Sequence, residues 1–182
     1  MPANIEIKAA LKNRGQALAT AARLADHAPE ILHQEDVFYR CEGARLKLRI
    51  HRSGDGHTNE SNAAHGELIR YQRENCAEVR RSSYLIARTG GSSGSRRHLA
   101  KTLGVIGTVR KTRTLFLVGQ TRVHIDQVEG LGDFLELEVV LREGQREEEA
   151  KQIANALLAE FGITSNEHIA VAYIDLLASA SR

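Results

Sequence analysis

Strand-like alternation with an ionised face recurs along this chain and constrains its fold more than any other feature. In residues 45–50, Arg45, Lys47 and Arg49 alternate with three aliphatic residues. Because successive side chains of a strand point to opposite sides of a sheet, this spacing predicts a strand with one apolar and one charged face. The polar face is nearly all ionised, which contact with bulk water does not require.

The same spacing predicts about eight strands, joined mostly by hairpin-length links. They are expected at residues 5–11, 31–39, 45–50, 67–73 and 80–86, with three more between 108 and 141 around a Gly119-Gln120 turn. Helical spacing predicts helices at 16–24, 96–103, 147–161 and 166–177. Stretches rich in small polar residues predict a flexible hairpin loop at about 53–65 and a linker at 90–94. A single α+β domain over residues 1–182, with an antiparallel sheet curled or closed, fits this order.

Composition excludes several classes of protein. The 182 residues include 25 basic and 23 acidic side chains, a formal net charge of +2, and only 4% aromatic residues with no tryptophan. Near-neutral charge and few stacking side chains argue against nucleic-acid binding. No apolar run approaches the roughly 20 residues of a membrane helix, the first strand begins too early for a secretory signal, and two distant cysteines make no disulfide framework. We expect a cytoplasmic protein without nucleic-acid or membrane partners.

If the strands share one register, their ionised faces collect on one side of the sheet. That side carries both signs of charge: Lys8, Arg45, Lys47, Arg49, Arg73, Arg80, Lys111, Arg113 and Arg122, with Glu6, Glu67, Asp126, Glu136 and Glu138. One interpretation is a solvated face, because antiparallel sheets commonly expose one side to water. The other is an anion held between the strands, since same-face neighbours lie only about 7 Å apart and like charges repel unless countered.

The chemistry of these residues favours the second interpretation. Arginine donates two hydrogen bonds at once to phosphate oxygens, so several arginines around one site suit a polyphosphate. Mg²⁺ is usually held by one or two carboxylates together with substrate phosphates. Glu6, Glu136 and Glu138 on the same side as the cations therefore indicate a metal–polyphosphate site inside a closed or nearly closed sheet.

Several short motifs point the same way. They are NIEIK (residues 4–8), RLKLR (45–49), VRKTR (109–113), VGQTRVHID (118–126) and GLGDF (130–134) followed by Glu136. Through these motifs nearly the whole chain resembles the CYTH family, the triphosphate-tunnel metalloenzymes, and most closely its class IV adenylyl cyclase branch. The resemblance implies an eight-stranded antiparallel β-barrel, a triphosphate tunnel, with helices packed on its outside and Mg²⁺ or Mn²⁺ as cofactor.

The resemblance also implies roles for individual positions. The triphosphate would be bound by Lys8, Lys47, Arg49, Arg73, Arg80, Lys111, Arg113 and Arg122, to which we add Arg45 from the same charged face. The metal would be bound by Glu6, Glu136 and Glu138, with Asp126 nearby, and Glu6, Lys8, Arg113 and Glu136 would be the catalytic residues. Asn4 departs from the family's opening Glu-x-Glu-x-Lys motif and removes one charged ligand.

Two reactions fit such a tunnel, and the sequence does not separate them. A cyclase would direct the 3′-hydroxyl of ATP at the α-phosphate and release pyrophosphate, whereas a hydrolase would direct water at the terminal phosphate. A third alternative, prompted by Asn4, is a non-catalytic triphosphate or polyphosphate binder. The expected small-molecule partners are ATP, thiamine triphosphate or tripolyphosphate, and a homodimer is an open alternative to a monomer. For His124, between Arg122 and Asp126, we expect a structural hydrogen bond.

Overall fold

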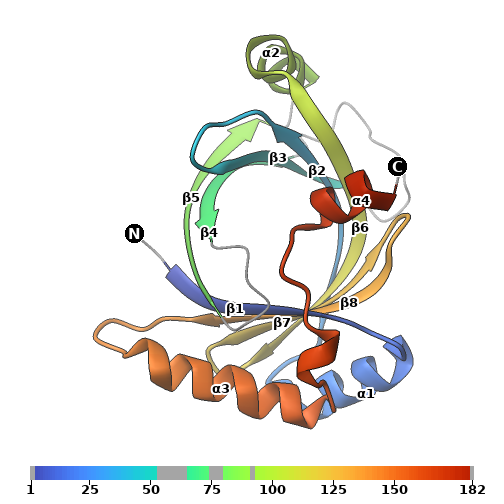
Figure 1. Cartoon of the computed structure of the whole chain (residues 1–182), viewed down its shortest axis with the longest axis vertical. Helices are drawn as coiled ribbons and strands as arrows, with labels where there is room; N and C mark the ends of the chain where they lie inside the picture. The colour runs from blue at the N-terminus through green and yellow to red at the C-terminus, as the bar shows by residue number, and fades with distance from the viewer. Residues whose placement is uncertain (1–2, 53–64, 74–79, 91–92, 181–182) are drawn as a thin grey trace.

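The computed structural model describes residues 3–52, 65–73, 80–90 and 93–180. These residues form eight strands: β1 (Ala3–Ala10), β2 (Glu30–Tyr39), β3 (Arg45–Arg52), β4 (His65–Arg73), β5 (Arg80–Gly90), β6 (Val105–Val118), β7 (Thr121–Val128) and β8 (Gly132–Val140). They pair antiparallel in the order β1-β5-β4-β3-β2-β6-β7-β8, and β8 returns to β1 to close a barrel (Figure 1). The predicted α+β fold with a closed antiparallel sheet is confirmed.

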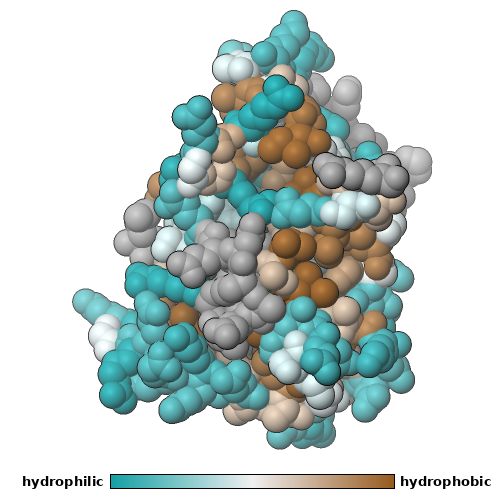
Figure 2. Space-filling view, viewed as in Figure 1, coloured by the Kyte–Doolittle hydropathy of each residue, from teal (hydrophilic) through white to brown (hydrophobic). Residues whose placement is uncertain are grey.

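Helices pack on the outside of this barrel. In Figure 1, α1 (Arg14–Leu24) and α3 (Glu147–Glu160) lie beneath β1, β7 and β8, and α2 (Ser93–Leu103) lies at the opposite end of the view. α3 buries Ala150, Ala154, Leu157 and Leu158, and Figure 2 shows hydrophilic residues on its outer side. Apolar residues at helical spacing produce this division into a buried and a solvated face.

The hydrophobic core lies between the barrel wall and the helices. Ile7, Ile125, Leu135 and Leu137 are at most 1% exposed and form one cluster with apolar residues of α1 and α3. Because neighbours along a strand point to opposite sides, an outward aliphatic face sends the alternate, charged residues into the lumen. The aliphatic and ionised faces therefore separate as the alternation predicts.

Glycines shape the two hairpins that link β6, β7 and β8. Gly119 lies in the predicted turn with a φ of +57°, and Gly130 and Gly132 have φ of +77° and +98°. Side chains other than glycine rarely adopt such angles. The two glycines of the Gly-Leu-Gly run therefore provide the backbone conformation that the β7–β8 hairpin requires. This hairpin places His124 directly opposite Glu136.

The C-terminal region differs from the single helix predicted over residues 166–177. It forms a short 3₁₀ turn, η1 (Ser165–Glu167), then an extended stretch, and then α4 (Tyr173–Ala180). The cause lies in β1, whose pairing with β5 covers only residues 3–6. Further along β1, the carbonyl of Lys8 accepts a hydrogen bond of 2.8 Å from the N–H of Ile169, and Ala9 bridges to His168. This backbone pairing takes the place of helical hydrogen bonds.

Two predicted links fall partly outside the described residues. Residues 53–64 of the expected hairpin loop and residues 91–92 of the expected linker belong to the part of the chain that the structure leaves undescribed. The described residues on either side are regular, because β5 extends to Gly90 and α2 begins at Ser93. None of the described helices combines the length and the apolar character that crossing a bilayer requires.

Candidate functional site

The lumen of the barrel contains a cavity of about 270 Å³. All eight strands line it, together with Ala172 and Tyr173 from the C-terminal region. Among the described side chains, its charged lining comprises Lys8, Lys47, Arg49, Lys111, Arg113 and Arg122 with Glu6, Asp36, Glu67, Glu136 and Glu138. Ligand pockets span about 300–1,000 Å³, so this cavity suits a small ligand. The charged faces enclose a space, which excludes the interpretation of a sheet face in bulk water.

Strand register decides which charges meet in the lumen. Two rows of side chains run across β1, β8 and β7: Lys8, Glu136 and His124 in one, and Glu6, Glu138 and Arg122 in the other. Facing carboxylates such as Glu6 and Glu138 repel each other unless a cation is near. Arg122 supplies one, with its Nη1 3.4 Å from Glu138 Oε2.

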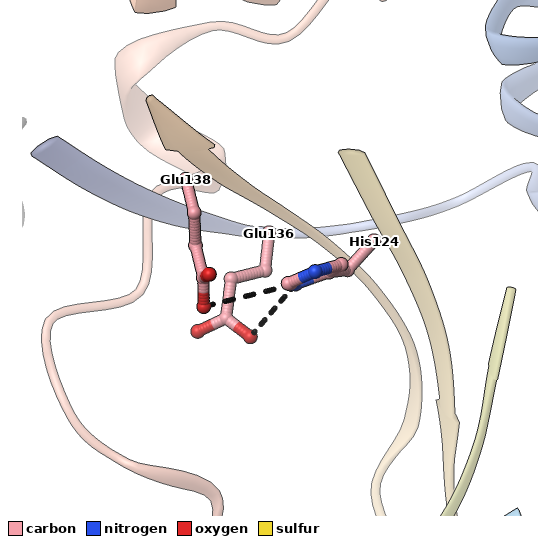
Figure 3. Close-up of side chains that lie close together, drawn as sticks. All are labelled: His124, Glu136 and Glu138. Atoms are coloured by element: carbon pink, nitrogen blue, oxygen red, sulfur yellow. Dashed lines mark ion pairs between the residues drawn. The ribbon is translucent and has the colours of Figure 1, made fainter. Parts of the chain in front are cut away.

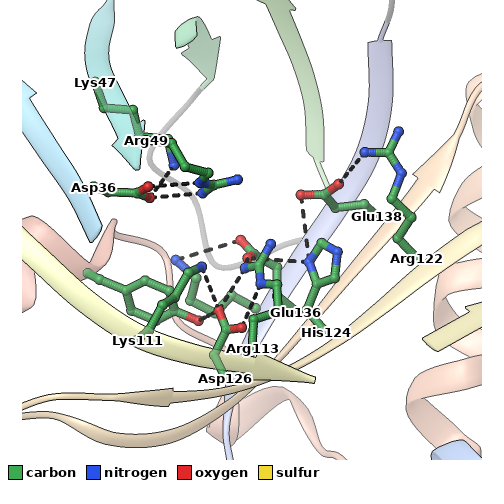
Figure 4. Close-up of polar contacts among 12 residues, drawn as sticks. Asp36, Lys47, Arg49, Lys111, Arg113, Arg122, His124, Asp126, Glu136 and Glu138 are labelled. Atoms are coloured by element: carbon green, nitrogen blue, oxygen red, sulfur yellow. Dashed lines mark hydrogen bonds and ion pairs between the residues drawn. The ribbon is translucent and has the colours of Figure 1, made fainter. Parts of the chain in front are cut away.

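Asp126 is the centre of a deeply buried cluster of charged residues in the lumen wall (Figure 4). Its carboxylate accepts hydrogen bonds from Lys111 Nζ at 2.8 Å, from Arg113 Nε and Nη2 at 2.6 and 2.7 Å, and from the Tyr173 hydroxyl at 3.0 Å. Burial opposes ionisation, but the charges of Arg113 and Lys111 hold the pKa of Asp126 well below its usual range. Asp126 is thus a fixed negative charge that orients both cations.

A second carboxylate organises the neighbouring wall formed by β2 and β3 (Figure 4). Asp36 accepts hydrogen bonds from Arg49 Nε and Nη2, both at 2.8 Å, and from Lys47 Nζ at 2.7 Å. Burial opposes its ionisation, but Arg49 and Lys47 hold the pKa of Asp36 well below its usual range. Burial and the charge of Arg49 lower the pKa of Lys47 to about 7. Lys47 therefore changes its charge near neutral pH.

Glu136, Glu138 and His124 form a group with the donor types of a metal site (Figure 3). Their ligand atoms all lie within 4.8 Å of one another. Despite burial, Lys8 and Arg113 hold the pKa of Glu136 well below its usual range, so this carboxylate is ionised. Burial and Arg113 lower the pKa of His124. Carboxylates and imidazole bind divalent cations, so this group is the candidate metal site among the described residues.

The C-terminal region lines one end of the cavity. Tyr173 packs against Phe134, with ring centroids 5.0 Å apart, in a cluster that includes Phe38 and Val109. Lys8 Nζ lies 4.0 Å from the centroid of the Tyr173 ring and donates a hydrogen bond of 3.3 Å to the backbone carbonyl of residue 171. Apolar side chains therefore pack around Tyr173 at this end, beside the buried charges.

The structure brings most of the predicted site residues together. Those that line the cavity are Glu6, Lys8, Lys47, Arg49, Lys111, Arg113, Arg122, Glu136 and Glu138. Arg45 instead forms a bidentate ion pair with Asp175 of α4, at 3.0 and 2.7 Å. Asp126 has no exposed surface and lies behind the lining. The side chains of Arg73 and Arg80 lie outside the described part of the structure.

Sequence reasoning did not assign Asp36 or Tyr173 to this site. It expected a structural hydrogen bond for His124, but its buried Nδ1 makes none and lies in the candidate metal group instead. Asp36 lies on the lumen-facing side of a predicted strand, so the alternation could have identified it as a partner for the cations opposite. Tyr173 reaches the lumen through the extended stretch before α4, and no periodicity in the sequence marks such a path.

Sequence comparison establishes the family. Residues 2–173 match the model of the CYTH domain, and the chain therefore belongs to the CYTH family. No curated protein matches this sequence. The eight-stranded barrel with outer helices, which the resemblance led us to expect, is the fold observed.

Solved structures share this fold at low sequence identity. The PH1012 protein from Pyrococcus horikoshii OT3 gives a TM-score of 0.78 at 21% identity, over 95% of this chain and 98% of that one. A candidate adenylate cyclase from Vibrio parahaemolyticus gives a TM-score of 0.71 at 20% sequence identity, over 96% of this chain and 97% of that one. HpAC1 from Hippeastrum gives a TM-score of 0.65 at 15% sequence identity, over 98% of this chain and 96% of that one. HpAC1 is a candidate adenylyl cyclase with a dominant triphosphatase activity. These similarities establish the fold, and the reaction must be argued from the site.

Proposed function

We propose that this protein is a metal-dependent triphosphatase, which binds a triphosphate in the lumen and transfers its terminal phosphoryl group to water. The observation that carries the proposal is that, among the described side chains, six cations and five carboxylates from different strands converge on one enclosed space. Cations alone would suit any anion, but carboxylates among them suit an anion that arrives with a metal ion. Membership of the CYTH family and the triphosphatase activity stated for HpAC1 support the same class.

The cations would bind the oxygens of the triphosphate. Arg49 uses two donors, Nε and Nη2, to hold Asp36. A guanidinium has five donors in a fixed plane, so this bidentate contact orients the remaining donors. Lys8 and Lys111 add compact ammonium groups at the end closed by Tyr173. Because carboxylates already hold these groups in place, binding a triphosphate requires little reorganisation.

The residues present fit a divalent cation. The buried Nδ1 of His124 has no hydrogen-bond partner, although it faces the carboxylates of Glu136 and Glu138. A buried polar atom without a partner is costly, and a cation between these groups would satisfy it. Glu136 and Glu138 would hold the metal, with Glu6 opposite Glu138 in the strand register. When bound, the metal would neutralise charge on the phosphate oxygens.

Phosphoryl transfer depends on positioning and charge stabilisation more than on covalent chemistry. Arg113 is held by Asp126 and Glu136 in a position where it can stabilise charge that develops on the transferred group. The apolar packing around Tyr173 excludes water from one end of the lumen. Water and substrate would then enter past more exposed lining residues such as Arg122 and His51.

A cyclase reaction like that of the class IV adenylyl cyclases is the second candidate, and one wall of the cavity favours it. On β4 and β5, Ile69 lies opposite Ile86 and Tyr71 opposite Tyr84, and all four line the cavity. Apolar and aromatic side chains there would accept an organic group such as a nucleobase, while the charged strands bind the phosphates. This wall also favours an organic triphosphate over tripolyphosphate as substrate.

One set of incubations separates the candidates. The protein is supplied with Mg²⁺ or Mn²⁺ and with ATP, thiamine triphosphate or tripolyphosphate, and the products are identified. Orthophosphate release supports the triphosphatase, and cyclic AMP with pyrophosphate supports the cyclase. Tight binding without either product, measured by calorimetry, indicates the non-catalytic binder. If none of the three compounds binds or reacts, the proposed function is wrong.

A further inference from the structure

The imidazole of His124 has an unusual environment for a histidine in a β-barrel. It is only 3% exposed, and its Nδ1 has no hydrogen-bond partner. The same nitrogen lies 3.8 Å from Glu136 Oε2 and 3.9 Å from Glu138 Oε1 (Figure 3). Both distances are too long for a hydrogen bond. Glu136 Oε2 accepts a hydrogen bond of 2.6 Å from Arg113 Nη2, but the buried Nδ1 of His124 points between the two carboxylates without a hydrogen-bond partner of its own. A cation bound among these three atoms would give this nitrogen a partner.

The spacing suits a metal ion as that group. Two ligands at about 2.1 Å from one cation are at most about 4.2 Å apart, and both nitrogen–oxygen distances lie within this limit. All three ligand atoms lie within 4.8 Å of one another. Glu138 binds Arg122 through Oε2, so its Oε1 is the oxygen nearer His124. Backbone pairing of β7 with β8 fixes His124 opposite Glu136, so the arrangement follows from the sheet itself.

We infer that His124 supplies a nitrogen ligand to the divalent cation held by Glu136 and Glu138, and that this mixed site favours Mn²⁺ over Mg²⁺. The inference rests on the proposed function, because it assigns a third ligand to the metal which that function requires. Mg²⁺ takes oxygen ligands almost exclusively, whereas first-row transition metals also accept imidazole. Replacing one oxygen ligand by a nitrogen thus weakens Mg²⁺ binding relative to Mn²⁺.

The test measures metal binding rather than turnover. Full-length protein, stripped of metal, is titrated with Mn²⁺ alone while the EPR signal of free Mn²⁺ is followed, and Mg²⁺ affinity is obtained by competition. We expect His124→Asn to weaken Mn²⁺ binding by about tenfold or more, the scale on which groups around a metal act, and Mg²⁺ binding by less than about twofold. His51→Asn is the matched control, because His51 also lines the cavity but pairs with Glu67 instead. It should leave both affinities within about twofold of the wild type.

Pulsed EPR of the wild-type protein gives a second measurement that needs no variant. Protein labelled with ¹⁵N-histidine should show nitrogen coupling to bound Mn²⁺. Bound Mn²⁺ without this coupling, an unchanged Mn²⁺ affinity in a folded His124→Asn variant, or no Mn²⁺ binding at millimolar protein would each overturn the inference. Orthophosphate release with Mg²⁺ in the absence of such coupling would leave the proposed function intact. Nitrogen coupling to bound Mn²⁺ in a protein that processes no triphosphate would support the His124 ligand and overturn the proposed function.

Discussion

At the scale of single residues, two aspartates hold the luminal cations in place. Asp126 forms ion pairs with Lys111 and Arg113, and Asp36 forms ion pairs with Lys47 and Arg49. Four cations this close would repel one another strongly in a buried space without counter-charges. The aspartates therefore allow a dense array of positive groups to exist in a folded protein, and their loss should affect stability before it affects metal binding.

Replacing Asp126 by asparagine tests this assignment against the initial expectation of a metal ligand. The variant loses the negative charge beneath Lys111 and Arg113, and breaking a buried ion pair typically costs about 3–5 kcal/mol of the free energy of unfolding. We expect a loss of that size in urea denaturation. Mn²⁺ affinity, measured by calorimetry, should fall by less than in Glu136→Gln, which alters a proposed ligand directly.

Asp133→Asn is the control for the same chemical change. Its carboxylate is partly exposed and lies 4.0 Å from Arg14, so its removal should change the free energy of unfolding by less than about 1 kcal/mol. An Asp126→Asn protein with wild-type stability but no measurable metal binding would return Asp126 to the metal site.

Lys47 should make triphosphate binding depend on pH. Its pKa of about 7 in the folded protein means that the amine is charged below about pH 7 and neutral above it. A bound triphosphate favours the charged form and raises this pKa, so binding takes up a proton as the pH rises above about 7. We expect the affinity for a non-hydrolysable imidotriphosphate, measured by calorimetry, to fall between about pH 7 and 9. Titration of Lys47 changes the slope of log affinity against pH by at most about one, which corresponds to one proton per site.

The triphosphate itself also titrates in this range, so the comparison with Lys47→Arg isolates the lysine. A guanidinium stays charged throughout, and the affinity ratio of variant to wild type should therefore grow with pH. Parallel affinity profiles for the two proteins would show that Lys47 does not titrate on binding.

At the scale of elements, the C-terminal region is held to the barrel at two points. Its extended stretch pairs with β1, and α4 is tied to β3 by the bidentate contact between Asp175 and Arg45. Gly107 of β6 allows close contact with α4, because an added Cβ would lie 2.6 Å from Ile174 Cδ1. Arg45 thus holds in place the helix whose first residue, Tyr173, lines the lumen.

Arg45→Gln and Arg49→Gln should consequently have different effects. Arg45 is partly exposed, so its ion pair contributes at most about 1 kcal/mol. We expect faster hydrogen exchange of α4 amides and a KM for the triphosphate within about twofold of the wild type. Arg49→Gln removes a proposed phosphate contact worth about 1.5–3 kcal/mol, which raises KM by about tenfold or more. Equal increases in KM would place Arg45 among the phosphate ligands.

The elements of the barrel could be predicted from the sequence because each strand carries its own pattern. Alternation in residues 45–50 and the turn at Gly119-Gln120 are local signals, and local structure follows them. Gly104 and Gly162 follow the ends of α2 and α3 with positive φ for the same reason. The prediction was wrong for the stretch before α4, because this stretch pairs with the backbone of β1, some 160 positions earlier in the chain. Lys8 and the residue whose carbonyl accepts its hydrogen bond, for example, are 163 positions apart. A contact so distant in the chain leaves no periodic signal.

Pairing inside the lumen could be predicted only in part. Alternation places Lys47, Arg49 and Asp36 on inward faces, but which carboxylate meets which cation depends on register between strands. His124 illustrates the limit, since its nearness to Glu138 requires both the β7–β8 register and the side-chain rotamers. Arg45 lies on the same strand face as Lys47, yet its position at the start of β3 brings it to α4 instead.

At the scale of the whole molecule, apolar packing and the proposed binding groups occupy opposite sides of the barrel wall. The outer face of the barrel carries most of the hydrophobic clusters beneath α1, α2 and α3, so the lumen need not be filled with aliphatic side chains. A closed barrel also has no unpaired edge strands, and its register holds luminal groups rigidly. The hydrophobic clusters outside the barrel therefore supply the stability that the buried ion pairs of the lumen do not, since such pairs contribute little to stability themselves.

This separation predicts that metal and triphosphate stabilise the fold together. Glu6, Glu136 and Glu138 repel a bare triphosphate, and the luminal cations repel a bare metal ion, so each ligand should improve the binding of the other. Imidotriphosphate with Mn²⁺, at about 100 times the dissociation constant, should add about 2.7 kcal/mol to the free energy of unfolding. For a chain of this length, that raises Tm by roughly 5–11 °C in scanning calorimetry. The rise with both ligands should exceed the sum of the separate rises, and a chelator should reverse the excess. Strictly additive shifts would mean that the two ligands bind apart, and a shift retained in Glu136→Gln would place the metal outside the lumen.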